Sequence, residues 1–405
     1  MALESVAISA FKEWFSEQGG YFHPSVLLLH GPTGVSAMAQ DTLVPDTTIV
    51  SCPFSLVITP ELSRKALSLL MDGSAVLNVW TERQLICAYI CFHWLISPQN
   101  STPDHLKHTH YLNTLPSSND LRTPLHFTSD ELDAFNGTNL YGATVDRECS
   151  WRSEWQACKT DISSVSSLWG EKFTWENYLT ASTYMSSRAF PSTLLSKEPT
   201  LKSTPSSYPV LIPGVDSLNH CRGLPISWVV SFPEPVAIST VNSTKPTVSL
   251  VGHTITQAGQ EVFNNYGPKP NSELILGYGF SLPQNQDDTI VLQIGGAPTS
   301  SRKKWEVGRK AHGAEGVWEE VLGLIAQGAE ATYEDELEAA DVLSEMLTSL
   351  IEHLPEVSDA DDDKDIRPEV ELMMEHYLEG QRSILDSLLE FIDLKRQSAI
   401  EAARD

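Results

Sequence analysis

Strand-like segments occur in two groups that lie far apart in this chain. Between residues 27 and 59, short β-branched or alternating runs are separated by turn sequences such as GPTG. Similar runs return between residues 228 and 264, after a long passage with the apolar spacing of helices. The sequence therefore predicts an α+β fold in which a helical insert divides a β-rich core into two halves.

The individual elements follow from the same patterns. Helices are predicted at residues 4–18, 62–71, 81–96, 130–136, 151–161 and 175–187. Strands are predicted at residues 27–30, 35–39, 48–52, 56–59, 228–232, 236–240, 247–250 and 261–264.

Beyond residue 290 the chain changes character. Apolar residues such as Val317, Val321, Ile384 and Leu388 recur at helical spacing, which predicts an all-α C-terminal domain. We therefore expect four segments: residues 1–60 with an N-terminal helix and the first half of the core, 61–209 as the insert, 210–290 as the second half of the core, and 291–405 as the acidic helical domain.

The charge of the chain is its one compositional extreme. The formal net charge is −26, and residues 301–405 contain 27 acidic and 11 basic side chains. Such a surface repels nucleic acid and attracts basic peptides. We expect a basic protein or peptide partner and no direct contact with nucleic acid, although a high charge also serves solubility alone.

Membrane insertion, secretion and metal binding are not indicated. The longest apolar run, LICAYICFHWLI at residues 85–96, has 12 residues, whereas a membrane span needs about 20. The N-terminus lacks the pattern of a signal peptide, so a cytoplasmic or nuclear location is expected. The six cysteines form no CxxC pair, which argues against a zinc site.

Two short stretches carry most of the functional information. Residues 213–221 read PGVDSLNHC and contain the pair Asn219-His220. Residues 263–280 read FNNYGPKPNSELILGYGF, in which Tyr266 follows two asparagines and Tyr278 begins a Tyr-Gly-Phe sequence. In this order they closely resemble the two C-terminal motifs of SET-domain protein methyltransferases.

Further segments resemble a narrower subgroup, typified by the Rubisco large-subunit methyltransferase and the fungal ribosomal-protein lysine methyltransferases. They are YLNTLP at 111–116, GTNLYGAT at 137–144, Trp151 with Glu154-Trp155, and FTWENYLTASTYMSSRAFP at 173–191. The resemblance implies that they belong to the insert that splits the SET core. It also implies that the acidic tail takes the place of the subgroup's substrate-binding domain.

The resemblance implies a site for S-adenosyl-L-methionine and a channel for the target lysine. Tyr266 is the implied catalytic residue. The implied cofactor-binding residues are Gly34, Ser36, Met38, Arg188, Asp216, Asn219, His220, Tyr278 and Phe280. Asp216, Tyr266 and Tyr278 are also implied to contact the substrate.

Several of these residues have a structural explanation beside the functional one. His220 alone is typical of a satisfied core histidine, Arg188 of a surface residue at a helix end, and Phe280 of core packing. The first cofactor loop also departs from the family's Gly-x-Gly, because it reads Gly34-Val35-Ser36. Glycine is favoured where backbone adopts positive φ or approaches a ligand closely, so Ser36 bears on cofactor affinity.

The implied reaction is an in-line displacement at a methyl group, in which positioning carries much of the catalysis. A tyrosine with an ordinary pKa of about 10 is a weak base at neutral pH, so Tyr266 is expected to orient and to stabilise charge. The lysine amine loses its proton as desolvation and the nearby sulfonium charge lower its pKa. Asn264 and Asn265 are expected to hold the turn that presents Tyr266.

The sequence thus predicts a monomeric protein-lysine N-methyltransferase whose substrate is a ribosomal protein or a translation factor. Two alternatives stay open. The acceptor could instead be a histidine or a histone lysine, because acceptor choice depends on the shape of the channel. The chain could also be a non-catalytic SET-like module that binds peptides.

Overall fold

The computed structural model describes residues 3–31, 34–96, 103–232, 245–294, 303–355 and 366–404. The chain forms two compact units. The first unit contains Met1–Leu121 and Cys149–Pro268, and the second contains Arg122–Glu148 and Lys269–Asp405. The predicted α+β class is confirmed, whereas the four predicted segment boundaries stay a prediction.

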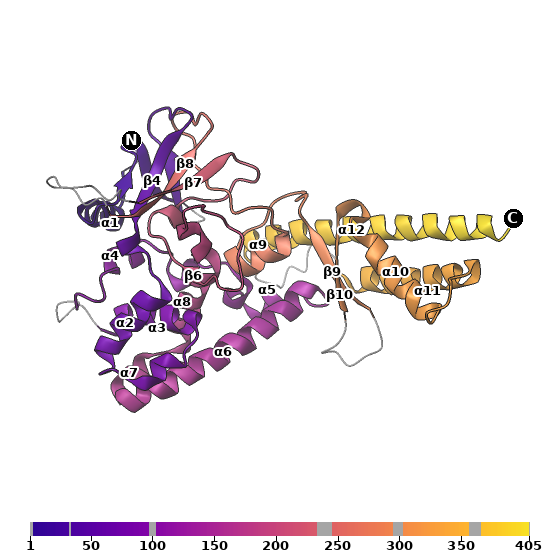
Figure 1. The fold of residues 1–405 in the computed structure, drawn as a ribbon, viewed down its shortest axis with the longest axis horizontal. Coiled ribbons are helices and arrows are strands. Elements are labelled where there is room, and N and C mark those ends of the chain that lie inside the picture. The colour runs from indigo at the N-terminus through magenta and orange to yellow at the C-terminus, as the bar shows by residue number, and fades with distance from the viewer. Residues whose placement is uncertain are drawn as a thin grey trace. The chain divides into compact units, whose positions relative to one another are not determined.

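One antiparallel sheet in the first unit joins the two strand groups (Figure 1). Its order is β1-β4-β8-β7, with β1 at Tyr21–Phe22, β4 at Thr47–Pro53, β8 at Thr247–Gly252 and β7 at Ile226–Ser231. Ser51 on β4 lies opposite Ser249 on β8, 198 positions further along the chain. Strands from before and after the insert therefore form a single β core.

A hairpin of β2 (Val26–Gly31) and β3 (Gly34–Ala39) continues this core. The other edge of β3 binds residues 260–262, since Val262 N donates to Ala37 O at 2.7 Å and Ala39 N to Gln260 O at 2.9 Å. Ala37 and Ala39 are buried, so Ser36 and Met38 lie on the opposite face of the strand. A third pair, β5 (Phe190–Pro191) with β6 (Pro209–Val210), lies after the insert helices.

Most helices of the first unit come, in the sequence, between the two strand groups. They are α1 (Val6–Glu17), α2 (Pro60–Leu70), α3 (Glu82–Leu95), α4 (Thr109–Leu112), α7 (Ser167–Lys172) and α8 (Trp175–Arg188), while α6 (Asn139–Val165) has residues in both units. The apolar run at 85–96 is the buried part of α3, as predicted, and a capping box of Thr81 and Gln84 begins that helix. Among the described residues, no helix is both long and apolar enough to cross a membrane.

Short 3₁₀ helices connect these elements. They are η1 (Phe54–Leu56), η2 (Ala75–Asn78), η3 (Ser118–Asp120), η4 (Pro124–His126), η5 (Ser192–Leu195), η6 (Val215–Ser217) and η8 (Arg309–Ala311).

Some sequence predictions were wrong at the level of single elements. Residues 56–59 form no strand, because Thr59 caps α2 and Pro60 begins it, which leaves one bridge between Ile58 and Leu211. Residues 261–264 form isolated bridges in place of a strand. The predicted strand at 236–240 lies outside the described residues.

The second unit is mostly helical. It contains α5 (Ser129–Asp133), α9 (Asn271–Tyr278), α10 (Ala314–Ile325), α11 (Tyr333–His353) and α12 (Pro368–Ala402). The expected helical C-terminal region is present, and the predicted apolar positions Val317, Val321, Ile384 and Leu388 are buried in its core. This region also holds a strand pair, β9 (Thr289–Ile294) with β10 (Lys303–Gly308), because Val307 and Trp305 alternate with exposed residues.

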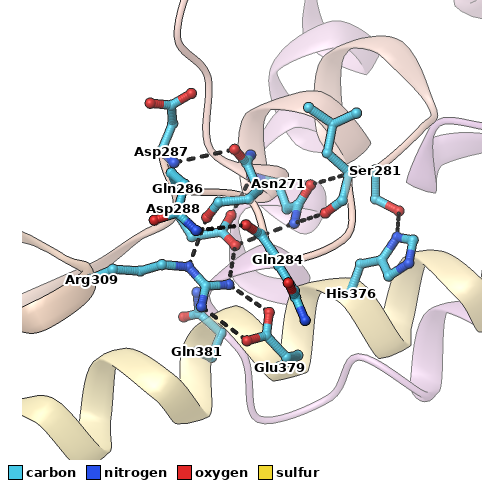
Figure 2. Close-up of polar contacts among 12 residues, drawn as sticks. Asn271, Ser281, Gln284, Gln286, Asp287, Asp288, Arg309, His376, Glu379 and Gln381 are labelled. Atoms are coloured by element: carbon cyan, nitrogen blue, oxygen red, sulfur yellow. Dashed lines mark hydrogen bonds and ion pairs between the residues drawn. The ribbon is translucent and has the colours of Figure 1, made fainter. Parts of the chain in front are cut away.

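A polar cluster anchors the start of α9 in the second unit (Figure 2). Asp288 accepts from Asn271 N at 2.7 Å and from Arg309 Nη2 at 3.2 Å, and Arg309 also pairs with Glu379 on α12. A Cβ atom on Gly380 would lie 2.3 Å from Asp288 Oδ2, so only glycine permits this approach to α12. The cluster fixes the helix that ends at Tyr278.

Candidate active site

Two segments of the first unit, residues 219–221 and the residues around Asn264, lie side by side. We call this place the crossing. Asn264 N donates to Asn219 O at 2.7 Å, and Cys221 N donates to Asn264 O at 2.8 Å. His220 and Asn264 thus form a parallel bridge. The crossing brings Asn219, His220 and Tyr266 together from motifs that are separated by more than forty residues.

His220 and Leu218 both help to hold Tyr266. Its ring stacks on His220 with centroids 5.0 Å apart and planes 24° apart. Its backbone N–H donates to His220 Nδ1 at 3.0 Å, and its hydroxyl donates to the Leu218 carbonyl at 2.8 Å. The hydroxyl proton is used in the hydrogen bond to the Leu218 carbonyl. The lone pairs of the hydroxyl oxygen can therefore face a positive group.

The turn after the crossing is held by asparagine side chains, as predicted. Asn264 Oδ1 accepts from Asn265 N at 2.7 Å, and Asn265 Oδ1 accepts from Gly267 N at 2.9 Å. Gly267 has φ of 88°, a conformation that favours glycine. These contacts direct the chain away immediately after Tyr266.

The β2–β3 hairpin carries the predicted first cofactor loop. Gly34 has φ of 108°, which explains the glycine at that position. Ser36 is not among the residues with positive φ, so its backbone does not require glycine. Its Oγ accepts from Asn219 Nδ2 at 3.3 Å. Met38 on the same strand is half-buried and bridges to Glu261.

Asn219 has a further partner that the sequence did not reveal. Its Nδ2 donates to Glu261 Oε1 at 2.7 Å, the shortest contact of that amide. The two residues lie 42 positions apart, and no local pattern links them. The pairing of residues 260–262 with β3 places Glu261 beside the predicted cofactor loop.

Arg188, at the end of α8, and Asp216, in η6, contact each other. Arg188 Nη1 donates to Asp216 O at 2.9 Å and lies 3.8 Å from Asp216 Oδ2. The Tyr111 hydroxyl donates to the same Oδ2, whereas Oδ1 has no partner with hydrogen-bond geometry among the described residues. Burial raises the pKa of Asp216, although the charge of Arg188 opposes that shift.

Tyr278 and Phe280 belong to the second unit. Their ring centroids are 6.1 Å apart in an edge-on arrangement, and Lys269 Nζ lies 5.6 Å from the Tyr278 ring. Gly279 between them ends α9 with φ of 79°. Their predicted contacts with the cofactor and the substrate stay a prediction.

The first unit's residues fit the chemistry of S-adenosyl-L-methionine. Arg188 offers a cation for a carboxylate, Asn219 an amide, and the oxygen of Tyr266 a negative dipole for a sulfonium. Among the described residues no cluster of three or more histidine, cysteine or acidic side chains has the arrangement of a metal site.

Sequence comparison finds relatives that are named lysine methyltransferases. No family model matches the chain. It is 32% identical over 258 residues to the ribosomal lysine N-methyltransferase set10 of Schizosaccharomyces pombe, covering 64% of this chain and 42% of that protein. It is 24% identical over 314 residues to the protein-lysine N-methyltransferase EFM1 of Saccharomyces cerevisiae, covering 68% and 50%. The chain thus spans about half the length of the curated relatives it matches.

Solved structures of Rubisco LSMT share the fold. Its SET domain bound to lysine and AdoHcy superposes with a TM-score of 0.75 at 16% identity, covering 98% of this chain and 93% of that one. The form bound to AdoMet gives 0.74 at 17% identity, covering 98% and 94%. The chain therefore has the fold of the LSMT SET domain. Its sequence relatives are protein-lysine methyltransferases, which confirms the family resemblance of the motifs.

Proposed function

We propose that this chain is an S-adenosyl-L-methionine-dependent protein-lysine N-methyltransferase. The observation that carries the proposal is the placement of Tyr266, whose hydroxyl is fixed on Leu218 O beside Asn219 and His220. A non-catalytic module has no need for a hydroxyl held in one orientation at the crossing of these segments. The sequence relatives named as lysine methyltransferases support the same reaction.

When bound, S-adenosyl-L-methionine supplies a methyl group on a positive sulfur, and transfer forms a nitrogen–carbon bond as the carbon–sulfur bond breaks. Tyr266 presents its lone pairs, which favour positive charge on the incoming amine and on the methyl group. His220 accepts from Tyr266 N and so fixes the position of the ring. The ammonium proton of lysine leaves to solvent before attack, so no dedicated protein base is required.

Arg188 and Asn219 would hold the amino-acid end of the cofactor, with Gly34, Ser36 and Met38 forming the wall of the site. Asp216 orients Arg188 through two contacts and leaves one buried oxygen available to a ligand. A role for Tyr278 and Phe280 in binding the cofactor, and for Tyr278 in binding the substrate, stays a prediction from the resemblance.

We propose a ribosomal protein or a translation factor as the substrate, and the relative set10, which is named a ribosomal lysine N-methyltransferase, supports the ribosomal choice. The excess of acidic side chains in residues 301–405 suits a basic partner and disfavours direct binding of nucleic acid. We further propose that the enzyme is monomeric and acts in the cytoplasm or the nucleus.

Transfer of labelled methyl groups into a ribosome-containing extract tests the proposal. We expect wild type to label one band, Tyr266→Phe to lose it, and Tyr208→Phe to retain it, because Tyr208 is an exposed tyrosine of the same unit. Mass spectrometry of the labelled peptide then identifies the acceptor. A methylated histidine or a histone lysine would replace the proposed acceptor, and the absence of any label would favour the peptide-binding module.

A further inference from the structure

The amide of Asn219 is the most constrained polar group of the candidate site. Its Nδ2 donates to Glu261 Oε1 at 2.7 Å, to Ser36 Oγ at 3.3 Å and, more weakly, to Val35 O at 3.5 Å. An amide nitrogen has two hydrogens, so both are used within the protein. In the part of the chain that the structure describes, nothing donates to Asn219 Oδ1.

Glu261 decides which way this amide faces. A carboxylate accepts hydrogen bonds, so a flipped Asn219 would bring its carbonyl oxygen against Oε1 and replace an attraction with a repulsion. The Ser36 hydroxyl and the Val35 carbonyl lie on the nitrogen side as well. A hydroxyl can donate as well as accept, so the orientation is selected by the two groups that only accept, Glu261 Oε1 and Val35 O. In that orientation the carbonyl oxygen of Asn219 is the atom left for a ligand.

We propose that Glu261 is a positioning residue that holds Asn219 so that its carbonyl oxygen accepts from the α-ammonium group of the cofactor, with Ser36 as a weaker second support. This inference rests on the proposed function, because it concerns a ligand with an amino-acid end. It assigns Asn219 to the ammonium group, while Arg188 is the group suited to the carboxylate.

The placement of Glu261 on the backbone agrees with this role. Glu261 bridges to Met38, and Ser36 lies two positions before Met38 on β3, so all three side chains share one face of the strand arrangement. Both supports reach Asn219 from this face. The serine that replaces the family's second glycine thus contributes an acceptor at the site.

Two ligands distinguish a loss of Asn219 positioning from general damage to the binding site. S-adenosylhomocysteine carries the α-ammonium group, whereas 5′-methylthioadenosine keeps the adenosine and lacks the amino-acid end. We expect Glu261→Ala to weaken S-adenosylhomocysteine binding about tenfold in calorimetry, the loss of roughly one well-placed hydrogen bond. Binding of 5′-methylthioadenosine should stay within about twofold, because the same bond is absent from that complex.

Glu261→Gln provides the rescue. Its amide oxygen can accept from Asn219 Nδ2, so affinity should return to within about threefold of wild type. In an Asn219→Ala background, Glu261→Ala should have no further effect, since the residue acts only through Asn219. Glu61→Ala, an exposed glutamate of the same unit, is the matched control.

The outcomes separate this inference from the proposed function. If wild type binds no S-adenosylhomocysteine, the proposed function fails. If wild type binds but Glu261→Ala binds equally well, or loses both ligands equally, the positioning role is overturned. A Glu261→Gln variant as weak as Glu261→Ala would also overturn it, because the charge would then act on the ligand directly.

Discussion

Two buried aspartates, one in each unit, show how a structural polar cluster differs from a site. Asp288 in the second unit uses both oxygens, accepting from Asn271 N on Oδ1 and from Asn271 Nδ2 and Arg309 on Oδ2. Asp216 in the first unit uses Oδ2 for Tyr111, whereas its Oδ1 has no partner with hydrogen-bond geometry among the described residues. Burial raises the pKa of both carboxyls.

The two aspartates differ in whether a carboxylate oxygen remains available to a ligand. A satisfied buried carboxylate stabilises the fold, and breaking one of its bonds leaves an uncompensated charge. An unsatisfied oxygen costs free energy in the absence of a ligand, and such groups are typical of functional sites. We therefore interpret the cluster of the second unit as a structural anchor, and we propose that of the first unit as part of a binding site.

The largest expected effect is a difference in kcat between variants of two tyrosines, one in each unit. Tyr266→Phe removes the hydroxyl that is fixed on Leu218, and we expect kcat to fall by at least about 100-fold, as for loss of one preorganised polar group. Tyr377→Phe removes a buried hydroxyl of the second unit and should lower the free energy of unfolding by about 1 kcal/mol with kcat unchanged. Steady-state kinetics and urea unfolding of both variants give the comparison, and equal kcat values would contradict it.

The next largest effect is expected in the free energy of unfolding, when each of the two aspartates is replaced. Asp288→Asn keeps the shape but removes the charge that faces Arg309, and we expect the free energy of unfolding to fall by about 2 to 3 kcal/mol. Asp216→Asn should cost less than about 1 kcal/mol, because it also relieves the burial of a charge that has an unpartnered oxygen. Equal losses in urea unfolding would remove the distinction between anchor and site.

Histidines provide a case in which the two units should behave alike. Burial lowers the pKa of His93 in the first unit and of His126 in the second to about 4. Each folded-state pKa lies below the unfolded value of about 6.5, so the folded state binds fewer protons and stability falls as pH drops from about 6.5 to 4.

We expect wild type to lose about 2 kcal/mol per buried histidine between pH 7 and pH 5. His93→Gln should reduce that loss, whereas the exposed His110→Gln should leave it unchanged. Urea unfolding at the two pH values measures both. A variant with the pH dependence of wild type would show that His93 is protonated equally in the folded and unfolded chains.

The smallest effect concerns the weakest bond of the Asn219 amide. Ser36→Gly restores the family's usual residue and removes an acceptor at 3.3 Å, so S-adenosylhomocysteine should bind about twofold more weakly. Calorimetry of this variant beside wild type measures the change. Tighter binding would mean that the missing glycine, and not the hydroxyl, controls the affinity.

The resemblance of the motifs predicts Asn219, His220 and Tyr266, and the structure brings these three residues together. Their roles stay a prediction. Glu261 was missed because its contact with Asn219 depends on the pairing of β3 with residues 260–262, which no local pattern specifies. Long-range pairing of this kind is set by the whole core.

The same limit applies to the fold. The split β core was predictable because strand and helix periodicities differ along the chain. The strand pair β9–β10 was missed since six-residue strands give weak patterns beside long helices. The compact grouping of Arg122–Glu148 with the C-terminal residues depends on contacts such as that of Arg367 with Glu131, 236 positions apart.

Hydrogen exchange with and without S-adenosylhomocysteine locates the bound ligand without requiring the substrate. We expect slower exchange in residues 34–39, 218–221 and 260–267, and unchanged exchange in α11 (Tyr333–His353). Unchanged exchange in all three segments, or protection confined to the second unit, would contradict a cofactor site at the crossing of Asn219-His220 with Tyr266.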